Sequence, residues 1–307
     1  MHTDVPIFIL GCPRSGTTLL ARLISDLLNY SIVESHFVTK YFHLLKKYGD
    51  LNQKNNFKRL FNDILRERPV QEWEITVDIE KAYKEIKSRT LEDITDYIST
   101  VRANKFGKQF WGDKTPHYLI DLDVLIRLFP TAKFIRIIRD GRDVSLSLMQ
   151  KKWGPNNVYA CAKSWVIYNT KHDTLFNQLK EEDKLIDILY EKLLVSPKSI
   201  MSKLMTFLNV SVSMEKIAEL SKLINSQNYN KWKHRLSQKD IQIFESIAGE
   251  CLQKYGYELI NDSPNISSIE RFLYALHDKT KWFTWFVYDN TINEFKIRFR
   301  GMRPFAD

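Results

Sequence analysis

Gly11 and Gly16 enclose a short loop whose composition suits the binding of an anion. Residues 8–18 read Phe-Ile-Leu-Gly-Cys-Pro-Arg-Ser-Gly-Thr-Thr, so the two glycines have the Gly-x-x-x-x-Gly spacing of a phosphate-binding loop. In nucleoside triphosphatases a lysine follows the second glycine and reaches the outer phosphates, but Thr17 occupies that position here. The loop therefore predicts an anion other than a nucleoside triphosphate, with backbone N–H groups and Arg14 as its partners.

A second candidate anion site lies at residues 133–148. Lys133 to Ile138 is rich in isoleucine and predicts a strand, which Arg139, an Asp-Gly turn and a helix carrying Ser147 follow. Ligands of open α/β sheets bind beyond the carboxyl ends of the strands, and a strand-turn-helix brings a guanidinium and a hydroxyl toward one phosphate. A solvated charged turn is the alternative interpretation of residues 139–143. The presence of both motifs, each between a predicted strand and a predicted helix, favours anion binding.

Both motifs require a parallel sheet to position them. The chain has 307 residues, 44% of them hydrophobic, which suffices for a large core. Short apolar runs alternate with segments of helical periodicity, a pattern typical of an α/β fold with a doubly wound parallel sheet flanked by helices. Strands are expected at 5–10, 30–33, 133–138 and 185–189, with a further strand that the segment 110–117 closes, and helices are expected at 17–28, 159–179 and 240–255.

Taken together, the two motifs resemble those of the sulfotransferases that use 3′-phosphoadenosine 5′-phosphosulfate (PAPS), in particular a bacterial-type, tyrosylprotein sulfotransferase-like branch. In that family a Pro-Arg/Lys-Ser-Gly-Thr-Thr loop holds the 5′-phosphosulfate, and an arginine with a serine eight residues later holds the 3′-phosphate. The residues that match are Pro13, Arg14, Ser15, Gly16, Thr17, Thr18, Arg139 and Ser147. The resemblance, over about residues 5–255, implies a P-loop-like fold and in-line transfer of a sulfuryl group, with 3′,5′-diphosphoadenosine (PAP) as product and no metal.

The resemblance also implies catalytic residues. Lys114 matches a lysine of the tyrosylprotein enzymes that polarises the sulfate, and Arg14 is a second cation beside the charge that develops. The base that takes the acceptor's proton has two candidates: Glu34, near the place of a family glutamate, and His117, displaced by one from the Lys-Thr-His of cytosolic members. His36 and Asp113 are weaker candidates, and an ordinary structural role is the alternative for each.

The nucleotide end is matched less closely. Tyr190 begins a Tyr-Glu-Lys-Leu segment that resembles a family Tyr-Glu-Asp-Leu, whose tyrosine lies near the nucleotide. Trp232 and Lys233 lie in a basic segment that resembles the late loop over the 3′-phosphate and adenine, although the Arg-Lys-Gly triplet of cytosolic members is missing.

The expected organisation is a sulfotransferase domain over 1–257 with a helical insertion at 36–106, followed by an aromatic-rich extension over 258–307 that packs on the domain. The insertion and the extension are the segments expected to contact the acceptor. In the extension, cations alternate with apolar residues at 296–300, so membrane contact is a weaker interpretation of this segment.

The charge and the cysteine content of the chain restrict the classes of partner that it is expected to bind. The net charge of +9 suits a cleft for a polyanionic cofactor, and nothing in the sequence matches a nucleic-acid-binding motif. The three cysteines lack metal-ligand spacing and indicate buried thiols, and the first residues show no secretory signal, so a cytoplasmic enzyme is expected. The expected acceptor is a small molecule, a carbohydrate or a peptide. The sequence does not decide whether the chain forms a homo-oligomer. The alternative functions are a P-loop kinase, which the lack of the loop lysine disfavours, and a non-catalytic nucleotide-binding or membrane-binding module.

Overall fold

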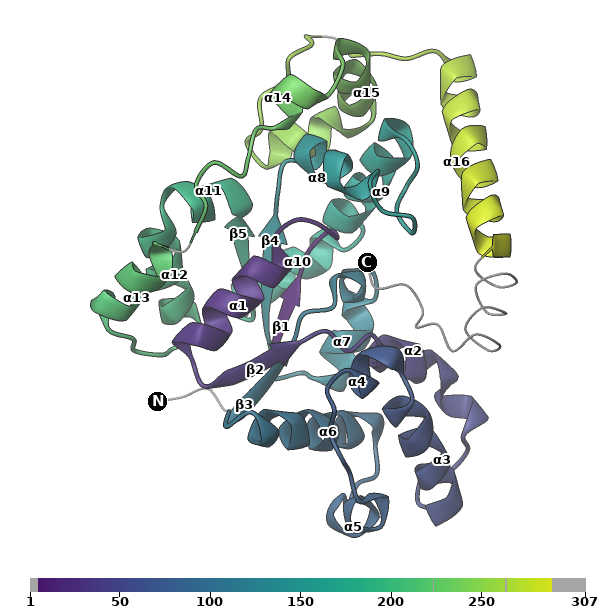
Figure 1. Ribbon diagram of the computed structural model, residues 1–307, viewed down its shortest axis with the longest axis vertical. Coiled ribbons are helices and arrows are strands. Elements are labelled where there is room, and N and C mark those ends of the chain that lie inside the picture. Colours follow the sequence, from purple (N-terminus) through teal and green to yellow (C-terminus); the bar gives the residue numbers. More distant parts are fainter. Residues whose placement is uncertain (1–4, 223, 263, 289–307) are drawn as a thin grey trace. The chain divides into compact units, whose positions relative to one another are not determined.

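A five-stranded parallel sheet organises the computed structural model, which describes residues 5–222, 224–262 and 264–288. The strand order is β2-β3-β1-β4-β5 (Figure 1), which confirms the predicted α/β class. The strands are β1 (Ile7–Leu10), β2 (Tyr30–Val33), β3 (Phe110–Asp113), β4 (Lys133–Ile138) and β5 (Leu185–Leu189). After β1 the chain continues toward β2 and after β4 it continues toward β5, so the order of the sheet reverses between β1 and β4. Ligands of such sheets bind at this reversal.

Contacts divide the described chain into two compact units. The first unit comprises residues 5–12, 16–138 and 172–226, and the second comprises 13–15, 139–171 and 227–288. The whole sheet belongs to the first unit, whereas Arg14 and Arg139 belong to the second.

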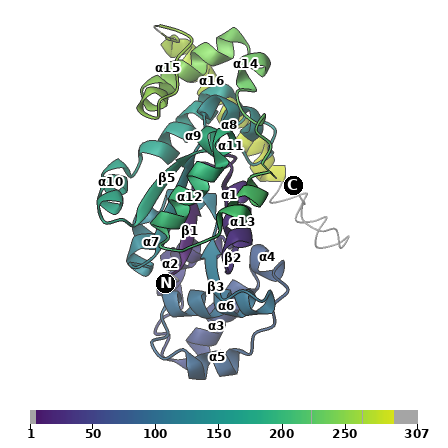
Figure 2. The ribbon, with the colours of Figure 1, turned by 90° about the vertical axis from the view of Figure 1, so that its left-hand side faces the viewer.

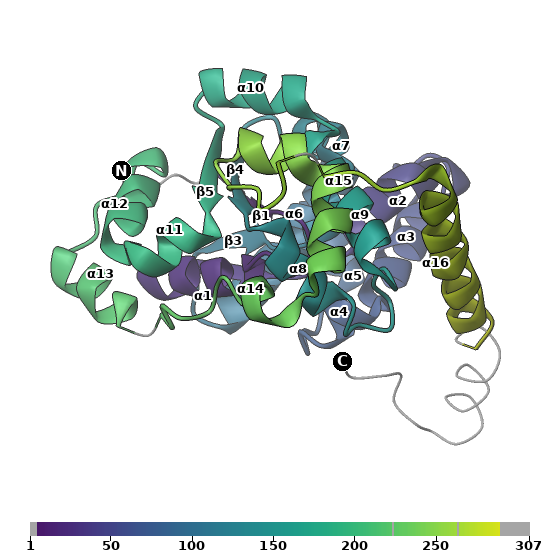
Figure 3. The same ribbon diagram turned by 90° about the horizontal axis from the view of Figure 1, so that it is seen from above.

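In the first unit, buried aromatic side chains hold the helices on the sheet. Phe8 of β1 contacts Trp111, Phe129 and Phe134, with ring centroids 5.2–6.0 Å apart. Figure 3 shows α1 on one side of the sheet and α7 and α10 on the other. Their bounds are Thr17–Leu27 for α1, Leu122–Leu128 for α7 and Asp173–Glu181 for α10. Burial of both faces explains why the strands are nearly continuous apolar runs.

Between β2 and β3 the chain forms helices only (Figure 2). They are α2 (Phe37–Leu44), the 3₁₀ helix η1 (Leu45–Lys47), α3 (Lys54–Leu65), α4 (Arg68–Gln71), α5 (Ile79–Glu85) and α6 (Leu91–Lys105). Asp78 and Thr90 cap α5 and α6 by accepting hydrogen bonds from first-turn N–H groups. The 3₁₀ helix η2 (Pro116–Leu119) follows β3, and α11 (Tyr190–Val195), α12 (Pro197–Phe207) and α13 (Met214–Ser221) follow β5.

The second unit is helical, and its core surrounds Trp165. The helices are α8 (Gly141–Leu148), α9 (Val158–Thr170), α14 (Trp232–Arg235), α15 (Gln238–Lys254) and α16 (Ser268–Tyr288). The Trp165 ring packs on Phe244 of α15, and its Nε1 donates a hydrogen bond of 3.0 Å to the Arg139 carbonyl. A Cβ atom on Gly141 would lie 2.5 Å from the Phe244 ring and 2.6 Å from the Trp165 ring, so only glycine fits at the start of α8.

The prediction of one helix over 159–179 is wrong, because the chain forms α9 and α10 with a break at residues 171 and 172. His172 Nε2 bonds to the Ile120 carbonyl at 2.8 Å, and the His172 carbonyl accepts the N–H of Phe176 at the start of α10. No glycine or proline marks the break, so its cause is tertiary.

Helix α16 has no buried side chain among those described, and it contacts the rest of the second unit through hydrogen bonds and through the Tyr274 ring, which stacks on Tyr159 of α9. Asn157 donates to the Tyr274 carbonyl at 2.9 Å, and the Asn156 N–H donates to Asp278 at 2.7 Å. In the part of the chain that the structure describes, no helix is long and apolar enough to cross a membrane. The alternating segment at 296–300 lies outside the described residues.

Candidate functional site

The loop after β1 has the backbone geometry of an anion cradle. Arg14 has φ 72° and Gly16 has φ 100°, so the chain turns sharply before α1 begins at Thr17. No side chain caps α1, which leaves its first N–H groups available to an anion. The Ser15 side chain is 1% exposed, and its Oγ has no hydrogen-bond partner among the described residues. An unsatisfied buried hydroxyl indicates a missing polar partner at this position.

Two glycines allow this loop to lie against its neighbours. A Cβ on Gly11 would lie 2.6 Å from the Ile137 carbonyl oxygen of β4, and a Cβ on Gly16 would lie 2.5 Å from the Tyr190 ring. Tyr190 is 3% exposed and begins α11 directly after β5. The structure therefore brings the predicted nucleotide-end tyrosine against the second glycine of the loop.

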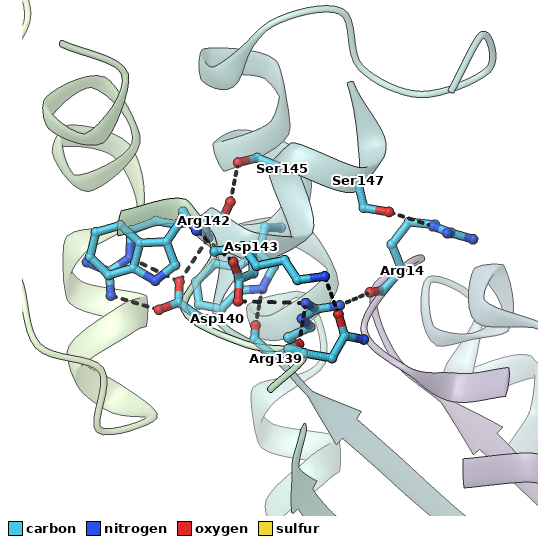
Figure 4. Close-up of polar contacts among 11 residues, drawn as sticks. Arg14, Arg139, Asp140, Arg142, Asp143, Ser145 and Ser147 are labelled. Carbon is cyan, nitrogen blue, oxygen red and sulfur yellow. Dashed lines mark hydrogen bonds and ion pairs between the residues drawn. The ribbon is translucent and has the colours of Figure 1, made fainter. Parts of the chain in front are cut away.

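In the second unit, Arg14, Arg139 and Ser147 meet, although the last two lie far from the first in sequence (Figure 4). Arg14 Nε donates a hydrogen bond of 2.9 Å to Ser147 Oγ, and Arg139 Nη1 donates one of 3.3 Å to the Arg14 carbonyl. Arg139 Nη2 also donates to the Asn228 carbonyl at 3.1 Å and lies 3.6 Å from Asp143. Arg139 thus contacts the backbone of Arg14, whose side chain contacts Ser147, and guanidinium and hydroxyl groups are both suited to bind a phosphate.

The turn that carries Arg139 is buried, and the alternative of a solvated charged turn is wrong. Arg142 is 2% exposed; it pairs with Asp140 at 2.8 Å and with Glu245 at 2.7 Å. Asp143 accepts the Trp232 N–H at 2.9 Å, and burial raises the pKa of its carboxyl. These contacts hold the turn in one conformation, which positions Arg139.

Trp232 and Lys233, predicted at the adenine end, have different environments. Trp232 is 2% exposed, and the guanidinium of Arg142 lies 3.7 Å from the centre of its ring. The ring thus packs in the core of the second unit by a cation–π contact. Lys233 is exposed.

In the first unit, Glu34 and Lys114 meet because their strands are neighbours. Val33 of β2 pairs with Asp113 of β3, so the next residue of each strand emerges at the same edge of the sheet. The Lys114 ammonium forms an ion pair with Glu34 Oε2, and His36 Nε2 lies 2.7 Å from Glu34 Oε1. Burial raises the pKa of the Glu34 carboxyl, but hydrogen bonds from His36 and Lys114 outweigh it and bring this pKa down to about 2.

His117 lies beside this group, on η2. It is exposed, and its ring centre is 6.5 Å from that of His36. Partial burial, and to a smaller extent the electrostatic effect of the neighbouring His36, lower the pKa of His117. Glu34, His36, Lys114 and His117 thus form one polar cluster of the first unit.

A buried hydrogen-bond network adjoins the cluster. The sequence predicted only one of its members, Asp113, as a candidate site residue. Asp113 accepts hydrogen bonds from the hydroxyls of Ser35 and Thr115, the second at 2.7 Å, and the Tyr118 hydroxyl lies 2.7 Å from Ser35 Oγ. Burial raises the pKa of Asp113 to about 6. Ser35, Thr115 and Tyr118 carry no sequence signal, because only the pairing of β2 with β3 makes them neighbours.

The described residues contain no group of three or more histidine, cysteine, aspartate or glutamate side chains that could hold a metal ion. Cys12, Cys161 and Cys251 are buried, as the sequence predicted. Burial raises the pKa of Cys161 to about 12.

Comparisons with known proteins agree with this architecture. Residues 6–214 match the model of a family described as "Sulfotransferase family". The chain is 25% identical to protein-tyrosine sulfotransferase 1 of Danio rerio over 292 residues, covering 86% of this chain and 76% of that protein. It is 26% identical to protein-tyrosine sulfotransferase 2 of Gallus gallus over 297 residues, covering 84% of this chain and 71% of that protein. The solved sulfotransferase domain of the Synechococcus PCC 7002 olefin synthase has the same fold, with a TM-score of 0.54 and 21% identity over 84% of this chain and 96% of that one.

Proposed function

The chain belongs to the sulfotransferase family, and from this premise we propose that it transfers the sulfuryl group of PAPS to a hydroxyl or amine of a small-molecule, carbohydrate or peptide acceptor. The observation that carries the choice of donor is the meeting of Arg14, Arg139 and Ser147. These side chains come from the two motifs that the sequence singled out, and their charge suits a phosphate dianion.

Each group of residues has a role in this proposal. Ser15, Gly16, Thr17 and Thr18 hold the 5′-phosphosulfate with backbone N–H groups and hydroxyls, and Pro13 shapes the turn that leads to them. Arg139 and Ser147 bind the 3′-phosphate, while Tyr190, Trp232 and Lys233 belong to the nucleotide end. The buried but unsatisfied Ser15 hydroxyl supports the first assignment.

In the reaction, the acceptor oxygen or nitrogen attacks sulfur in line with the bond to the bridging oxygen. That bond breaks, PAP leaves with the electron pair, and negative charge builds on the bridging oxygen. Lys114 and Arg14 stabilise this charge, and preorganised cations of this kind are usually the largest single catalytic contribution. A base beside Lys114 receives the acceptor's proton, and the candidates are Glu34 and His117.

The first acceptor class to test is a peptide that contains tyrosine, because protein-tyrosine sulfotransferases of Danio rerio and Gallus gallus are among the relatives. The helices between β2 and β3 and helix α16 are the segments proposed to select the acceptor.

The test is transfer of label from radiolabelled PAPS to a panel of a single-tyrosine peptide, a sugar alcohol, an aliphatic alcohol and an amine, in the presence of EDTA. We expect transfer to at least one class. Transfer of labelled phosphate from ATP with Mg²⁺ instead would establish the kinase alternative. Tight binding of PAP without transfer to any class would establish a nucleotide-binding module.

A further inference from the structure

The apolar side of helix α16 (yellow in Figure 1) is exposed to solvent. The side chains of Ile269, Phe272, Leu273, Leu276 and Phe283 are 47–73% exposed. Spacings of three, four and seven residues place them along one side of the helix, where they form an apolar stripe. Exposed apolar patches of this kind mark a surface for a protein partner or a membrane.

The opposite side of α16 holds the helix on the second unit. Glu270, Tyr274 and Asp278 are four residues apart and partly buried, so they share one side. Glu270 forms an ion pair of 3.2 Å with Lys239 of α15, and the Tyr274 ring stacks on that of Tyr159 in α9. Because the helix packs by this polar side, the apolar stripe can meet a partner while α16 stays in place.

The charges that α16 exposes are positive. Arg271, Lys279 and Lys281 are exposed, and none of them is in an ion pair with another residue that the structure describes. The two acidic side chains of the helix are both engaged, Glu270 in the ion pair with α15 and Asp278 in a hydrogen bond of 2.7 Å from a backbone N–H. These exposed charges therefore favour an anionic partner.

A groove between α9 and α16 brings a further cation to this surface. Its volume is about 320 Å³, and its lining includes Tyr159, Lys163 and Ile167 of α9 and Asp278 and Lys279 of α16. The two lysines are exposed, and the Asp278 carboxylate is engaged as described above. An apolar groove with two ammonium groups beside it suits a lipid, whose acyl chains are apolar and whose headgroup carries a phosphate.

The C-terminal end of α16 has the composition of a membrane-interface segment. Trp282 is 53% exposed, and Phe283 follows it in the stripe. Aromatic side chains gather at the level of lipid headgroups, where an apolar ring meets a polar surface. In the sequence beyond the helix, residues 296–303 contain four cations and no acidic residue. Anionic headgroups attract such basic segments.

A second copy of the chain fits this surface less well. Pairs of apolar helices are usually held in register by opposite charges at the positions beside the seam. Beside the apolar stripe these positions hold Lys279 on one side and Glu270, His277 and Thr284 on the other, and Glu270 is already paired with α15. Lys279 thus gains no acidic partner in such a pair, whereas an anionic headgroup would neutralise it.

We propose that the apolar stripe of α16, together with Lys163 and Lys279, binds the surface of a membrane that contains anionic lipids. The helix lies in the plane of the interface, where its apolar side chains enter the acyl boundary and the two ammonium groups contact headgroup phosphates. A chain held in this way meets acceptors that lie at the membrane, which agrees with the acceptor-selecting role proposed for α16. The inference itself does not depend on sulfuryl transfer.

Sedimentation of the full chain with vesicles tests the proposal. The vesicles consist of phosphatidylcholine alone or of equal parts of phosphatidylcholine and phosphatidylglycerol. We expect binding to the mixed vesicles and weaker binding to phosphatidylcholine, and added salt should reduce the difference because it screens the charges. Failure of the wild type to bind the mixed vesicles would overturn the proposal. Since a net charge of +9 attracts anionic vesicles to any surface of the chain, variants must locate the site.

The double variant Leu273→Gln, Leu276→Gln removes apolar contacts without a change of charge. It should bind the mixed vesicles at least about 10-fold more weakly. The matched control is Val195→Gln, Met214→Gln, whose wild-type side chains are 61% and 56% exposed in the first unit. This control should bind within about twofold of the wild type, and denaturant unfolding should show both variants folded, since none of the four side chains is buried. Equal binding of the two variants would contradict a site on α16.

The lysines of the groove are tested by Lys163→Gln, Lys279→Gln. Each lysine near an anionic surface contributes to binding, so this variant should bind the mixed vesicles at least about 10-fold more weakly. Lys198→Gln, Lys203→Gln is the control, because it removes the same charge from two exposed lysines of α12. If both pairs weaken binding equally, only the net charge attracts the chain, and the proposal is refuted.

Sedimentation velocity without vesicles distinguishes a second copy as the occupant. We expect the wild type and the Leu273→Gln, Leu276→Gln variant to have the same mass. A wild-type dimer that this variant dissociates would assign the stripe to a second copy and overturn the membrane proposal. None of these measurements uses PAPS, so their failure is distinguishable from failure of the transfer assay.

Discussion

At the scale of single residues, Arg139 is proposed to contact the cofactor, and folding alone holds its side chain in place. Arg139 is 8% exposed, and its guanidinium is held by the Arg14 and Asn228 carbonyls and by Asp143. Most of the entropy cost of ordering this side chain is therefore paid on folding, and an incoming phosphate gains a positioned charge.

Removal of that charge should weaken PAP binding. For Arg139→Ala we expect a loss of about 1.5–3 kcal/mol in PAP affinity, the range for a charge-assisted hydrogen bond, measured by calorimetry. Lys133→Ala is the control, because Lys133 lies at the other end of β4 and bonds to Asp183. Equal affinities of the two variants would remove Arg139 from the site.

Lys114 is expected to act on the developing charge more than on ground-state binding. Lys114→Ala should lower kcat at least about 10²-fold while the Kd for PAP changes much less. The measurement is steady-state kinetics beside calorimetry, with Lys108→Ala as control, since Lys108 bonds to the Ser25 carbonyl on the same unit. Near-normal turnover would mean that Lys114 only pairs with Glu34.

Asp113 makes stability depend on pH in a direction opposite to that of most carboxylates. Burial raises its pKa from 3.8 to about 6, so its stabilising contribution is full below the unfolded value and is lost as the pH rises through 6. The pKa of Glu34 is lowered to about 2, so its contribution is present above 4.5 and lost only in acid.

The two effects can be separated by denaturant unfolding between pH 5 and 7.5. Over this interval the free energy of unfolding of the wild type should fall by about 1–2 kcal/mol relative to that of Asp113→Asn. Asp183→Asn, whose side chain is 78% exposed, should follow the wild type. Parallel curves for the wild type and Asp113→Asn would show that Asp113 is ionised throughout.

At the scale of elements, the start of α8 joins the Arg139 turn to the core of the second unit. Gly141→Ala should destabilise the protein by about 1–3 kcal/mol, because its Cβ would overlap the Phe244 and Trp165 rings, 2.5 and 2.6 Å away. Gly249→Ala in α15 is the matched control, since its Cβ would meet only Leu259 at 3.5 Å. We expect that control to be neutral or to stabilise by about 0.4–1 kcal/mol in denaturant unfolding. Equal stabilities of the two variants would contradict the packing described here.

At the scale of the whole molecule, binding of the proposed cofactor is expected to be linked to the stability of the folded chain. A ligand that binds only the folded chain stabilises it, by about 2.7 kcal/mol at 100 times its Kd.

PAP should therefore raise the Tm without Mg²⁺, and ATP or AMP at the same concentration should raise it much less. The contrast follows from the phosphate site that we propose at Arg139 and from the lack of a loop lysine, because Thr17 occupies that position. Thermal unfolding with each nucleotide, in EDTA and then in Mg²⁺, measures it. An equal shift with ATP, or a shift that appears only with Mg²⁺, would favour the kinase alternative.

Local pattern was sufficient to predict the sheet, the loop at residues 11–18 and the turn at 139–143. Strand periodicity, glycine spacing and the order of strand, turn and helix are properties of consecutive residues, so the sequence determined them. The sequence pattern did not predict the contacts between segments that are distant in the chain. The pairing of Val33 with Asp113 brings Glu34 beside Lys114, and the contact of His172 with Ile120 separates α9 from α10. Likewise, only the tertiary structure shows that the Arg142 guanidinium lies over the Trp232 ring. A tryptophan in a basic segment has the same sequence pattern whether it is buried or exposed. Such outcomes depend on which strands are neighbours and on which side chains compete for one space, and both are set by the tertiary structure.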